Sequence, residues 1–144
     1  MYTITVIRII TVFKVIIMKK QHFSKKREDI LNTIYNTNTH PTAEWVYDQL
    51  KPKYSDLSLG TVYRNIGLFK DQGLIKSVGT VNGKERFDGN TKEHAHFVCS
   101  VCGVVLDIEN NDYKLDVDSI FSEKYGINIY AKEITFYGKC NSCI

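Results

Sequence analysis

The sequence predicts an α+β protein whose first part is a winged helix-turn-helix. Three observations predict it: three amphipathic helical patterns between residues 24 and 73, a hairpin signal directly after them, and a charge that changes sign along the chain. Residues 1–86 hold 14 Lys and Arg against 7 Asp and Glu, a net +7, whereas residues 87–144 hold 5 against 9, a net −4. Only the first part is suited to a polyanion such as DNA.

The N-terminal stretch MYTITVIRIITVFKVII is apolar, but it is shorter than a membrane span and is interrupted by Arg8 and Lys14. It lacks the basic start and the small-residue cleavage site of a signal peptide. We expect Met18 to be the natural start and residues 1–17 to be an upstream extension without a required role; an added strand or short helix is the alternative. The protein is then cytoplasmic, has no membrane partner, and keeps its cysteines in a reducing compartment.

Two helices are predicted first. In FSKKREDILNTIYN, Ser24 is a suitable N-cap, and in PTAEWVYDQL, Thr42 caps while Glu44 suits the positive end of the helix dipole. Pro52 marks the end of the second helix. The expected core face of the first helix comprises Ile30, Leu31, Ile34 and Tyr35.

A third helix, LGTVYRNIGLFKDQG, has Ser58 as N-cap and Gly73 just past its end. At 100° per residue, one stripe faces the core. This stripe comprises Leu59, Val62, Ile66 and Phe69. The opposite face is slim enough to enter a groove; it carries Gly60, Thr61, Arg64 and Gly67, with Tyr63 at its edge.

A hairpin follows in LIKSVGTVNGKERFD, where Asn82-Gly83 is a strong turn signal between two strand-like segments. Lys76, Lys84 and Arg86 make the hairpin basic. Three helices and a basic hairpin describe a winged helix whose third helix lies in the DNA major groove; the alternative is a small helical subdomain with a solvated basic surface. The predicted DNA contacts are Gly60, Thr61, Tyr63, Arg64, Lys76 and Lys84.

All four cysteines fall in two pairs, Cys99-x-x-Cys102 and Cys140-x-x-Cys143. Four thiolates match the closed tetrahedral shell of structural Zn²⁺. Zinc here would tie the C-terminus to the strand near residue 100 and contribute on the order of 10 kcal/mol to folding. The alternatives are two disulfides, disfavoured in a reducing compartment, and a redox CxxC, disfavoured because neither pair opens a helix after a βαβ strand.

His94 and His96 are separated by one residue, so both imidazoles point to the same side of a strand. Such a pair is more often a coincidence than a ligand pair, but carboxylates and a further histidine accompany it. Asp107 lies on the apolar strand GVVLDIEN, Asp88 ends the hairpin, and His40 lies in the turn before PTAEW. Three imidazoles and two carboxylates suit Fe²⁺, Mn²⁺ or Zn²⁺, and the filled site is nearly neutral.

From about Lys20 to Cys143, the chain resembles the ferric uptake regulator family of metal-dependent repressors. The resemblance rests on HPTAEWVYDQL, LSLGTVYRNIGLFKDQGLI, RFD, HAHFVCSVCG and the terminal YGKCNSC. It implies a winged-helix domain at residues 18–88, a small α/β dimerisation domain at residues 89–144, and a homodimer on a palindromic operator in double-stranded DNA. The protein is then a transcriptional repressor and not an enzyme.

Within that family the chain looks most like the peroxide-sensing branch. The resemblance implies that His40, Asp88, His94, His96 and Asp107 hold a regulatory Fe²⁺ or Mn²⁺, and that the four cysteines hold structural zinc. Asp107 decides the branch, because iron-sensing relatives usually carry Glu there. In the peroxide-sensing branch, Fe²⁺ and hydrogen peroxide oxidise a ligand histidine, here His40 or His94, and the repressor leaves its operator.

Three alternatives stay open at this point. An iron-responsive repressor of metal-uptake genes would carry the same ligands without sensing peroxide. A metalloenzyme is disfavoured, because no Ser or Cys nucleophile is left over and no H-E-x-x-H pattern occurs. A zinc-stabilised DNA-binding module would not respond to added Fe²⁺ or Mn²⁺. The segment NIYAKEITFYG holds no histidine, so a second regulatory site that needs one is not expected.

Overall fold

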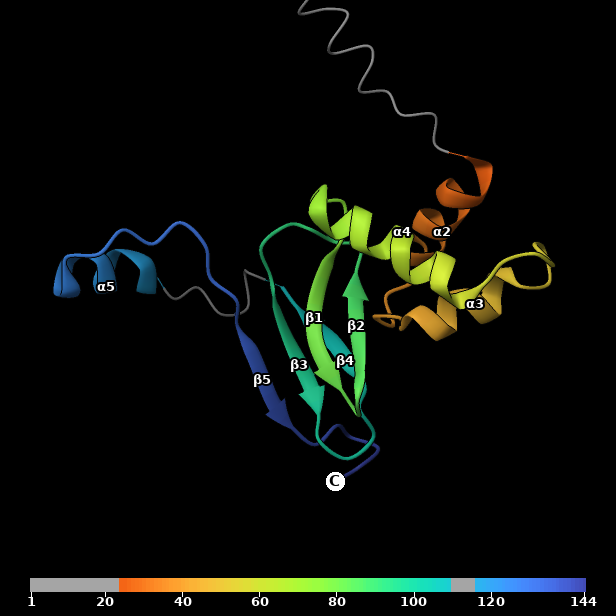
Figure 1. The fold of residues 1–144 in the computed structure, drawn as a ribbon. Helices are drawn as coiled ribbons and strands as arrows, with labels where there is room; N and C mark the ends of the chain where they lie inside the picture. The colour runs from red at the N-terminus through yellow and green to blue at the C-terminus, as the bar shows by residue number, and fades with distance from the viewer. Residues whose placement is uncertain (1–23, 110–115) are drawn as a thin grey trace, which may run out of the picture.

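The computed structural model describes residues 24–109 and 116–144. A helical part with a β-hairpin lies beside a three-stranded sheet, and one further helix lies beyond the edge of that sheet (Figure 1). The elements are α2 (Lys25–Tyr35), α3 (Ala43–Leu50), α4 (Leu59–Asp71), β1 (Lys76–Val81), β2 (Lys84–Asp88), β3 (Ala95–Cys99), β4 (Val105–Ile108), α5 (Val117–Tyr125) and β5 (Thr135–Gly138). The extension at residues 1–17 and the expected start at Met18 lie outside the described residues.

The predicted helix ends are confirmed. Ser24, Thr42 and Ser58 each accept a hydrogen bond from the backbone N–H three residues later, which satisfies a donor that the first helical turn leaves free. At the end of α4, Gly73 has a φ of +68°. The N–H of Leu74 donates to the carbonyl of Phe69 at 2.9 Å, as in a Schellman motif.

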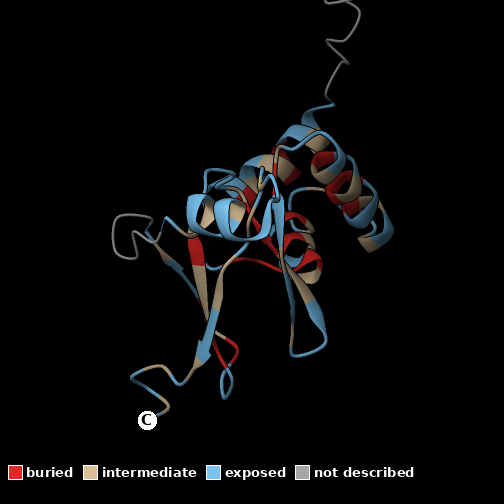
Figure 2. Ribbon diagram, turned by 90° about the vertical axis from the view of Figure 1, so that its left-hand side faces the viewer, coloured by how far each residue is buried: buried red, intermediate tan, exposed pale blue. Residues whose placement is uncertain are grey.

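The hairpin belongs to the helical part, because Phe87 on β2 is fully buried in the core formed by α2, α3 and α4. The N–H of Phe87 also donates to the carbonyl of Pro41 at 3.0 Å, next to the turn that carries His40. Asn82 and Gly83 have φ values of +53° and +77°, as the predicted two-residue turn requires. Figure 2 shows the buried residues concentrated in this part.

One residue of the expected core face is placed differently. Tyr35 is 44% exposed at the end of α2, and its hydroxyl donates to the carbonyl of Leu74 at 3.0 Å. Its ring lies over Gly89, where a Cβ atom would come within 2.7 Å of Tyr35 Cδ1. The helical periodicity was therefore wrong to assign Tyr35 to the core. Its ring packs on the segment after β2 instead.

The second sheet has the order β4-β3-β5, with β3 antiparallel to β4 and parallel to β5. The return from β4 to β5 includes α5, as a parallel pair requires a crossover connection. This arrangement confirms the predicted α+β class. The predicted boundary between residues 88 and 89 falls at the end of β2 and stays a prediction. Within the described ranges, no helix is both long enough and apolar enough to cross a membrane.

Candidate metal centres and DNA-binding surface

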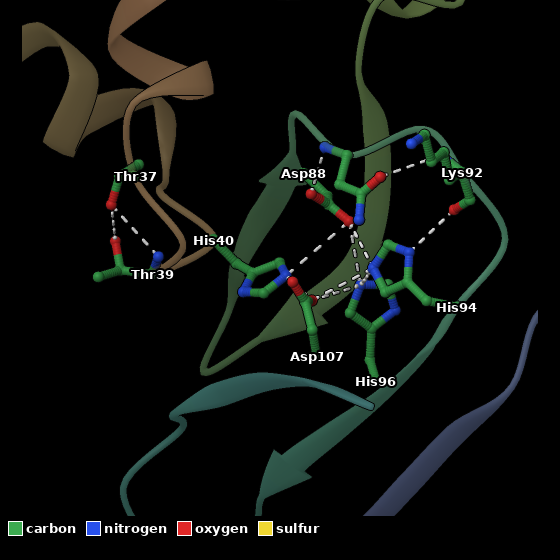
Figure 3. A network of polar contacts seen from close by, with 9 residues as sticks. Thr37, Thr39, His40, Asp88, Lys92, His94, His96 and Asp107 are labelled. Atoms are coloured by element: carbon green, nitrogen blue, oxygen red, sulfur yellow. Dashed lines mark hydrogen bonds and ion pairs between the residues drawn. The ribbon is translucent and has the colours of Figure 1, made fainter. Parts of the chain in front are cut away.

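Five side chains from four segments of the chain converge on one point (Figure 3). His40 comes from the turn before α3, Asp88 from the end of β2, His94 and His96 from the start of β3, and Asp107 from β4. Each offers a nitrogen or oxygen atom, and these atoms all lie within 4.8 Å of one another. The structure therefore brings together every residue that the sequence predicts for the regulatory site.

The strand register explains part of this geometry, because His96 lies directly opposite Asp107 in the β3–β4 pair. His94 Nε2 lies 3.0 Å from His96 Nε2 and 2.9 Å from Asp88 Oδ2. His40 Nε2 lies 2.8 Å from Asp107 Oδ1, and His96 Nε2 lies 3.2 Å from Asp88 Oδ2. The backbone of His40 reaches this position with a φ of +52°, which is uncommon for a residue other than glycine.

The donor set fits a divalent cation. Both ring nitrogens of His40 are buried, and neither makes a hydrogen bond of good geometry, whereas buried polar groups are nearly always partnered. The Nε2 atoms of His94 and His96 lie within about hydrogen-bond distance of each other and of the carboxylates of Asp88 and Asp107. One divalent cation satisfies these lone pairs and balances the two negative charges, and three nitrogens with two oxygens suit Fe²⁺, Mn²⁺ or Zn²⁺.

Asp88 is held in its charged form. Burial alone would raise the pKa of its carboxyl, but hydrogen bonds from His96 and from the Asn90 N–H, together with nearby imidazoles, lower that pKa below its usual value. The Asn90 N–H donates to Asp88 Oδ1 at 2.7 Å. Asp88 can therefore present a carboxylate to the cluster.

The four cysteines meet at the other end of β3. Cys99 lies opposite Gly138 in the parallel β3–β5 pair, so both chain segments leave the sheet at the same end. The four sulfur atoms lie within 4.8 Å of one another, and Cys102 Sγ is 3.6 Å from Cys140 Sγ. Thiolates around Zn²⁺, with Zn–S distances of about 2.3 Å, form a tetrahedron with edges of about 3.8 Å. All four thiols are free, and no disulfide joins them.

The thiols differ in how readily they ionise. Backbone N–H groups of Cys102 and Cys140 lower the pKa of the Cys99 thiol to about 6. Hydrogen bonds with Cys140 and Cys102 raise the pKa of the Cys143 thiol to about 12. Four thiolates this close together require a balancing cation, so the cluster fits Zn²⁺, which displaces the thiol protons as it binds.

The turn after Cys99 also contacts the hairpin. Arg86 Nη2 on β2 donates to the carbonyl of Gly103 at 3.1 Å, so this basic residue is engaged within the molecule. Gly103 has a φ of +73°, and a Cβ atom there would lie 2.4 Å from Asn82 Nδ2 in the hairpin turn. The cysteine cluster therefore supports the hairpin as well as the C-terminus.

The predicted DNA-binding residues lie on α4 and at the two ends of the hairpin. On α4, Gly60, Tyr63 and Arg64 are exposed, while Thr61 is partly buried. Lys84 lies next to the hairpin turn. Lys76 instead lies at the foot of the hairpin, opposite Asp88 and far along the strands from Lys84.

Glu44 was noted in the sequence only as a residue at a helix start. The Tyr63 hydroxyl donates to Glu44 Oε1 at 2.9 Å, and Lys84 Nζ lies 3.9 Å from Glu44 Oε2. Glu44 thus joins the α4 face to the hairpin. No local pattern indicates these contacts, because they join residues far apart in the sequence.

Asn90 was also missed, although Asp-Gly-Asn is a sequence typical of side-chain-to-backbone turns. Its neighbours on both sides, Asp88 and His94, belong to the histidine and aspartate cluster. The turn sequence between the predicted ligands Asp88 and His94 was the only local signal that pointed to a role for Asn90.

Comparison with known proteins gives a consistent result. Residues 19–137 match the model of the ferric uptake regulator family. The chain is 30% identical to the peroxide-responsive repressor PerR of Staphylococcus aureus over 118 residues, which are 82% of this chain and 79% of that protein.

Two solved structures are similar. The Campylobacter jejuni peroxide stress regulator has a TM-score of 0.73 at 29% identity, with 89% of this chain and 98% of that chain covered. The Helicobacter pylori ferric uptake regulator Fur has a TM-score of 0.77 at 20% identity, with 94% and 90% covered. The second likeness concerns the fold alone.

Proposed function

This chain belongs to the ferric uptake regulator family, and from that premise we propose that it is a repressor that senses hydrogen peroxide. Members of the family are metal-dependent, DNA-binding transcriptional regulators, which excludes the metalloenzyme alternative. The observation that carries the proposal is the cluster of three histidines and two aspartates that joins the helical part to the second sheet. Relatives at 30% identity are peroxide-responsive, and Asp107 has the residue type expected of that branch.

The placement of the ligands provides the means of regulation. His40 and Asp88 belong to the helical part, while His94, His96 and Asp107 lie on the β3–β4 side. A cation bound by all of them holds the two parts at one angle. In a dimer, that angle sets the spacing of the two α4 helices, which must match half-sites about one helical turn apart. Metal binding then shifts the population toward the DNA-competent form, by no more than its difference in affinity for the two forms.

We infer that a second copy of the chain completes the DNA-binding unit. In the single chain α5 buries no residue, and Ile120, Phe121 and Tyr125 are 58%, 43% and 61% exposed. On β5, Tyr137 is 75% exposed. Such an apolar surface suits a symmetric interface, and a palindromic operator needs two recognition helices. Binding to an operator also implies work in the cytoplasm, where the chromosome lies.

The two clusters have different proposed roles. Zn²⁺ is held permanently by Cys99, Cys102, Cys140 and Cys143, and Fe²⁺ or Mn²⁺ is held reversibly by the cluster of histidines and aspartates. When bound, Fe²⁺ would supply the electrons that cleave the O–O bond of hydrogen peroxide, whereas Mn²⁺ does not run this reaction readily. The chain contributes oxidisable imidazoles, and those of His40 and His94 are buried at the cluster. An imidazole that has gained an oxygen atom is a poorer ligand, so the two parts separate and the operator is released.

Protein loaded with Fe²⁺ and exposed to low peroxide is expected to gain the mass of one oxygen atom on a peptide that contains His40 or His94. It should lose operator affinity at the same time. Peptide mass spectrometry and fluorescence anisotropy measure the two effects, and Mn²⁺-loaded protein is the matched control. Equal oxidation with both metals refutes the proposal that the protein senses hydrogen peroxide through bound Fe²⁺. No oxidation, with Fe²⁺ still activating DNA binding, identifies the iron-responsive alternative instead.

Arg64→Ala is expected to weaken binding to a DNA fragment selected in vitro by roughly 10- to 100-fold, because a bidentate Arg–guanine contact contributes about 1–3 kcal/mol. Arg64 is exposed on α4, so the contents of both metals should not change. Lys139→Ala removes the same charge from the acidic part of the chain and should have little effect. Native affinity in Arg64→Ala would contradict the assigned recognition face.

A further inference from the structure

The segment between β2 and β3 contains a continuous series of hydrogen bonds. Asp88 Oδ1 accepts from the Asn90 N–H at 2.7 Å, and Asn90 Oδ1 accepts from the Lys92 N–H at 3.2 Å. The Lys92 carbonyl oxygen lies 2.9 Å from His94 Nδ1. Each bond spans two residues, so the series runs without a break from one proposed ligand to the next. Figure 3 shows its two ends beside the cluster.

Each end of the series determines which ligand atom faces the cluster. At Asp88, Oδ1 is occupied by the N–H of Asn90, and Oδ2 is the atom 2.9 Å from His94 Nε2. At His94, a carbonyl oxygen can only accept, so the contact holds a proton on Nδ1 and leaves Nε2 as the ring nitrogen that faces the cluster. The hydrogen bond of one ring nitrogen generally decides whether the other can bind a metal.

The carboxamide of Asn90 is the one side chain inside this series, since the groups between Asp88 and His94 otherwise belong to the backbone. Asn90 is exposed, so its conformation is not explained by packing in a core. The segment is also fixed from behind, because Gly89 lies against Tyr35 too closely for any side chain. The conformation of the segment between β2 and β3 therefore depends on the hydrogen bond that Asn90 Oδ1 accepts from the Lys92 N–H.

We propose that Asn90 is a positioning residue for the regulatory metal. Its carboxamide oxygen holds the segment between β2 and β3 so that Asp88 turns Oδ2 and His94 turns Nε2 toward the cluster before a divalent cation arrives. This inference rests on the proposed function of the cluster as a metal site. Without the acceptor, Lys92 is released, its carbonyl turns away from His94, and the imidazole is no longer held with Nε2 toward the cluster.

The test uses full-length, zinc-loaded protein and three variants. Asn90→Ala removes the acceptor, Asn90→Asp keeps an acceptor oxygen in the same place, and Thr91→Ala changes the exposed neighbour as a control. Paramagnetic resonance of free Mn²⁺ gives the dissociation constant of the regulatory site. Nitrogen-15 NMR of the histidine rings, without regulatory metal, gives the position of the His94 proton. Zinc content and circular dichroism verify that each variant is folded.

In Asn90→Ala, Mn²⁺ binding is expected to weaken about 10- to 100-fold, the range known for loss of a group that orients a ligand. The His94 ring should change from the Nδ1–H form to a mixture, and Asn90→Asp should restore both properties. Native Mn²⁺ affinity, a native ring form in Asn90→Ala, or equal loss in Asn90→Asp overturns the proposal. If the native protein binds no Mn²⁺, the proposed function fails, and the ring measurement still decides whether Asn90 holds His94.

Discussion

Cys140→Ser is expected to release the zinc and unfold the second part of the chain. A structural Zn²⁺ site contributes on the order of 10 kcal/mol, which is comparable to the whole stability of a domain. Cys140 sits at the centre of the cluster, since its N–H donates to Cys99 Sγ at 3.4 Å and its sulfur lies 3.6 Å from that of Cys102. Zinc per chain, measured by mass spectrometry of the metal, should fall from one to near zero.

The loss should reach beyond the cysteines. The turn at Gly103 supports the hairpin through Arg86 and Asn82. We therefore expect lower thermal stability, loss of the dimer in sedimentation, and weak DNA binding even with Mn²⁺ present. Ser142→Ala, an exposed change in the turn between Cys140 and Cys143, is the control and should behave as native. A stable dimer of Cys140→Ser that retains zinc would contradict the structural role of the cluster.

The parts of the fold that the sequence predicts best are those decided within a few residues. The caps at Ser24, Thr42 and Ser58 depend on a side chain and an N–H three positions away. The turn at Asn82-Gly83 depends on two residues that tolerate positive φ. Tyr35 shows the limit of this approach, because its ring packs on Gly89, and no periodicity in α2 reports a contact with a distant segment.

In the candidate sites, too, local features were predictable from the sequence and contacts between distant segments were not. Residue type and spacing, together with the family resemblance, were sufficient to select the residues that the structure brings together in the two clusters, since few residue types bind metals and the CxxC pairs are close in sequence. The relation of Arg86 to Gly103 and of Tyr63 to Glu44 was not predictable, because each joins segments that meet only after folding. Helix α5 was missed as well, since it buries no residue and therefore has no core-facing stripe.

His40→Ala is expected to separate metal binding from DNA binding. His40 is the proposed ligand that lies before α4 in the chain, in the turn whose Pro41 carbonyl accepts the N–H of Phe87. Without its imidazole, four ligands remain near β2, β3 and β4, so Mn²⁺ still binds at higher concentration. The turn before α3 is then no longer held to Asp107, which lies 2.8 Å from His40 Nε2 in the native chain.

Asp107→Asn is the matched variant on the other side of the cluster. It removes one of two negative charges, so Mn²⁺ affinity should fall by roughly 100-fold, about 2.8 kcal/mol. Its amide oxygen can still complete the site, and His40 still connects the helical part. At saturating Mn²⁺, Asp107→Asn should therefore recover nearly native DNA affinity.

The comparison at saturating Mn²⁺ tests whether the metal acts on DNA binding through His40. If the cation fixes the angle between the two parts mainly through His40, His40→Ala should stay at least about tenfold weaker on DNA than Asp107→Asn, a difference of about 1.4 kcal/mol. If the cation only adds stability or positive charge, both variants should recover together once the site is filled. Anisotropy titrations of labelled DNA over a range of Mn²⁺ concentrations measure this difference. Equal recovery, or no recovery of Asp107→Asn, would show that His40 does not couple the metal to α4.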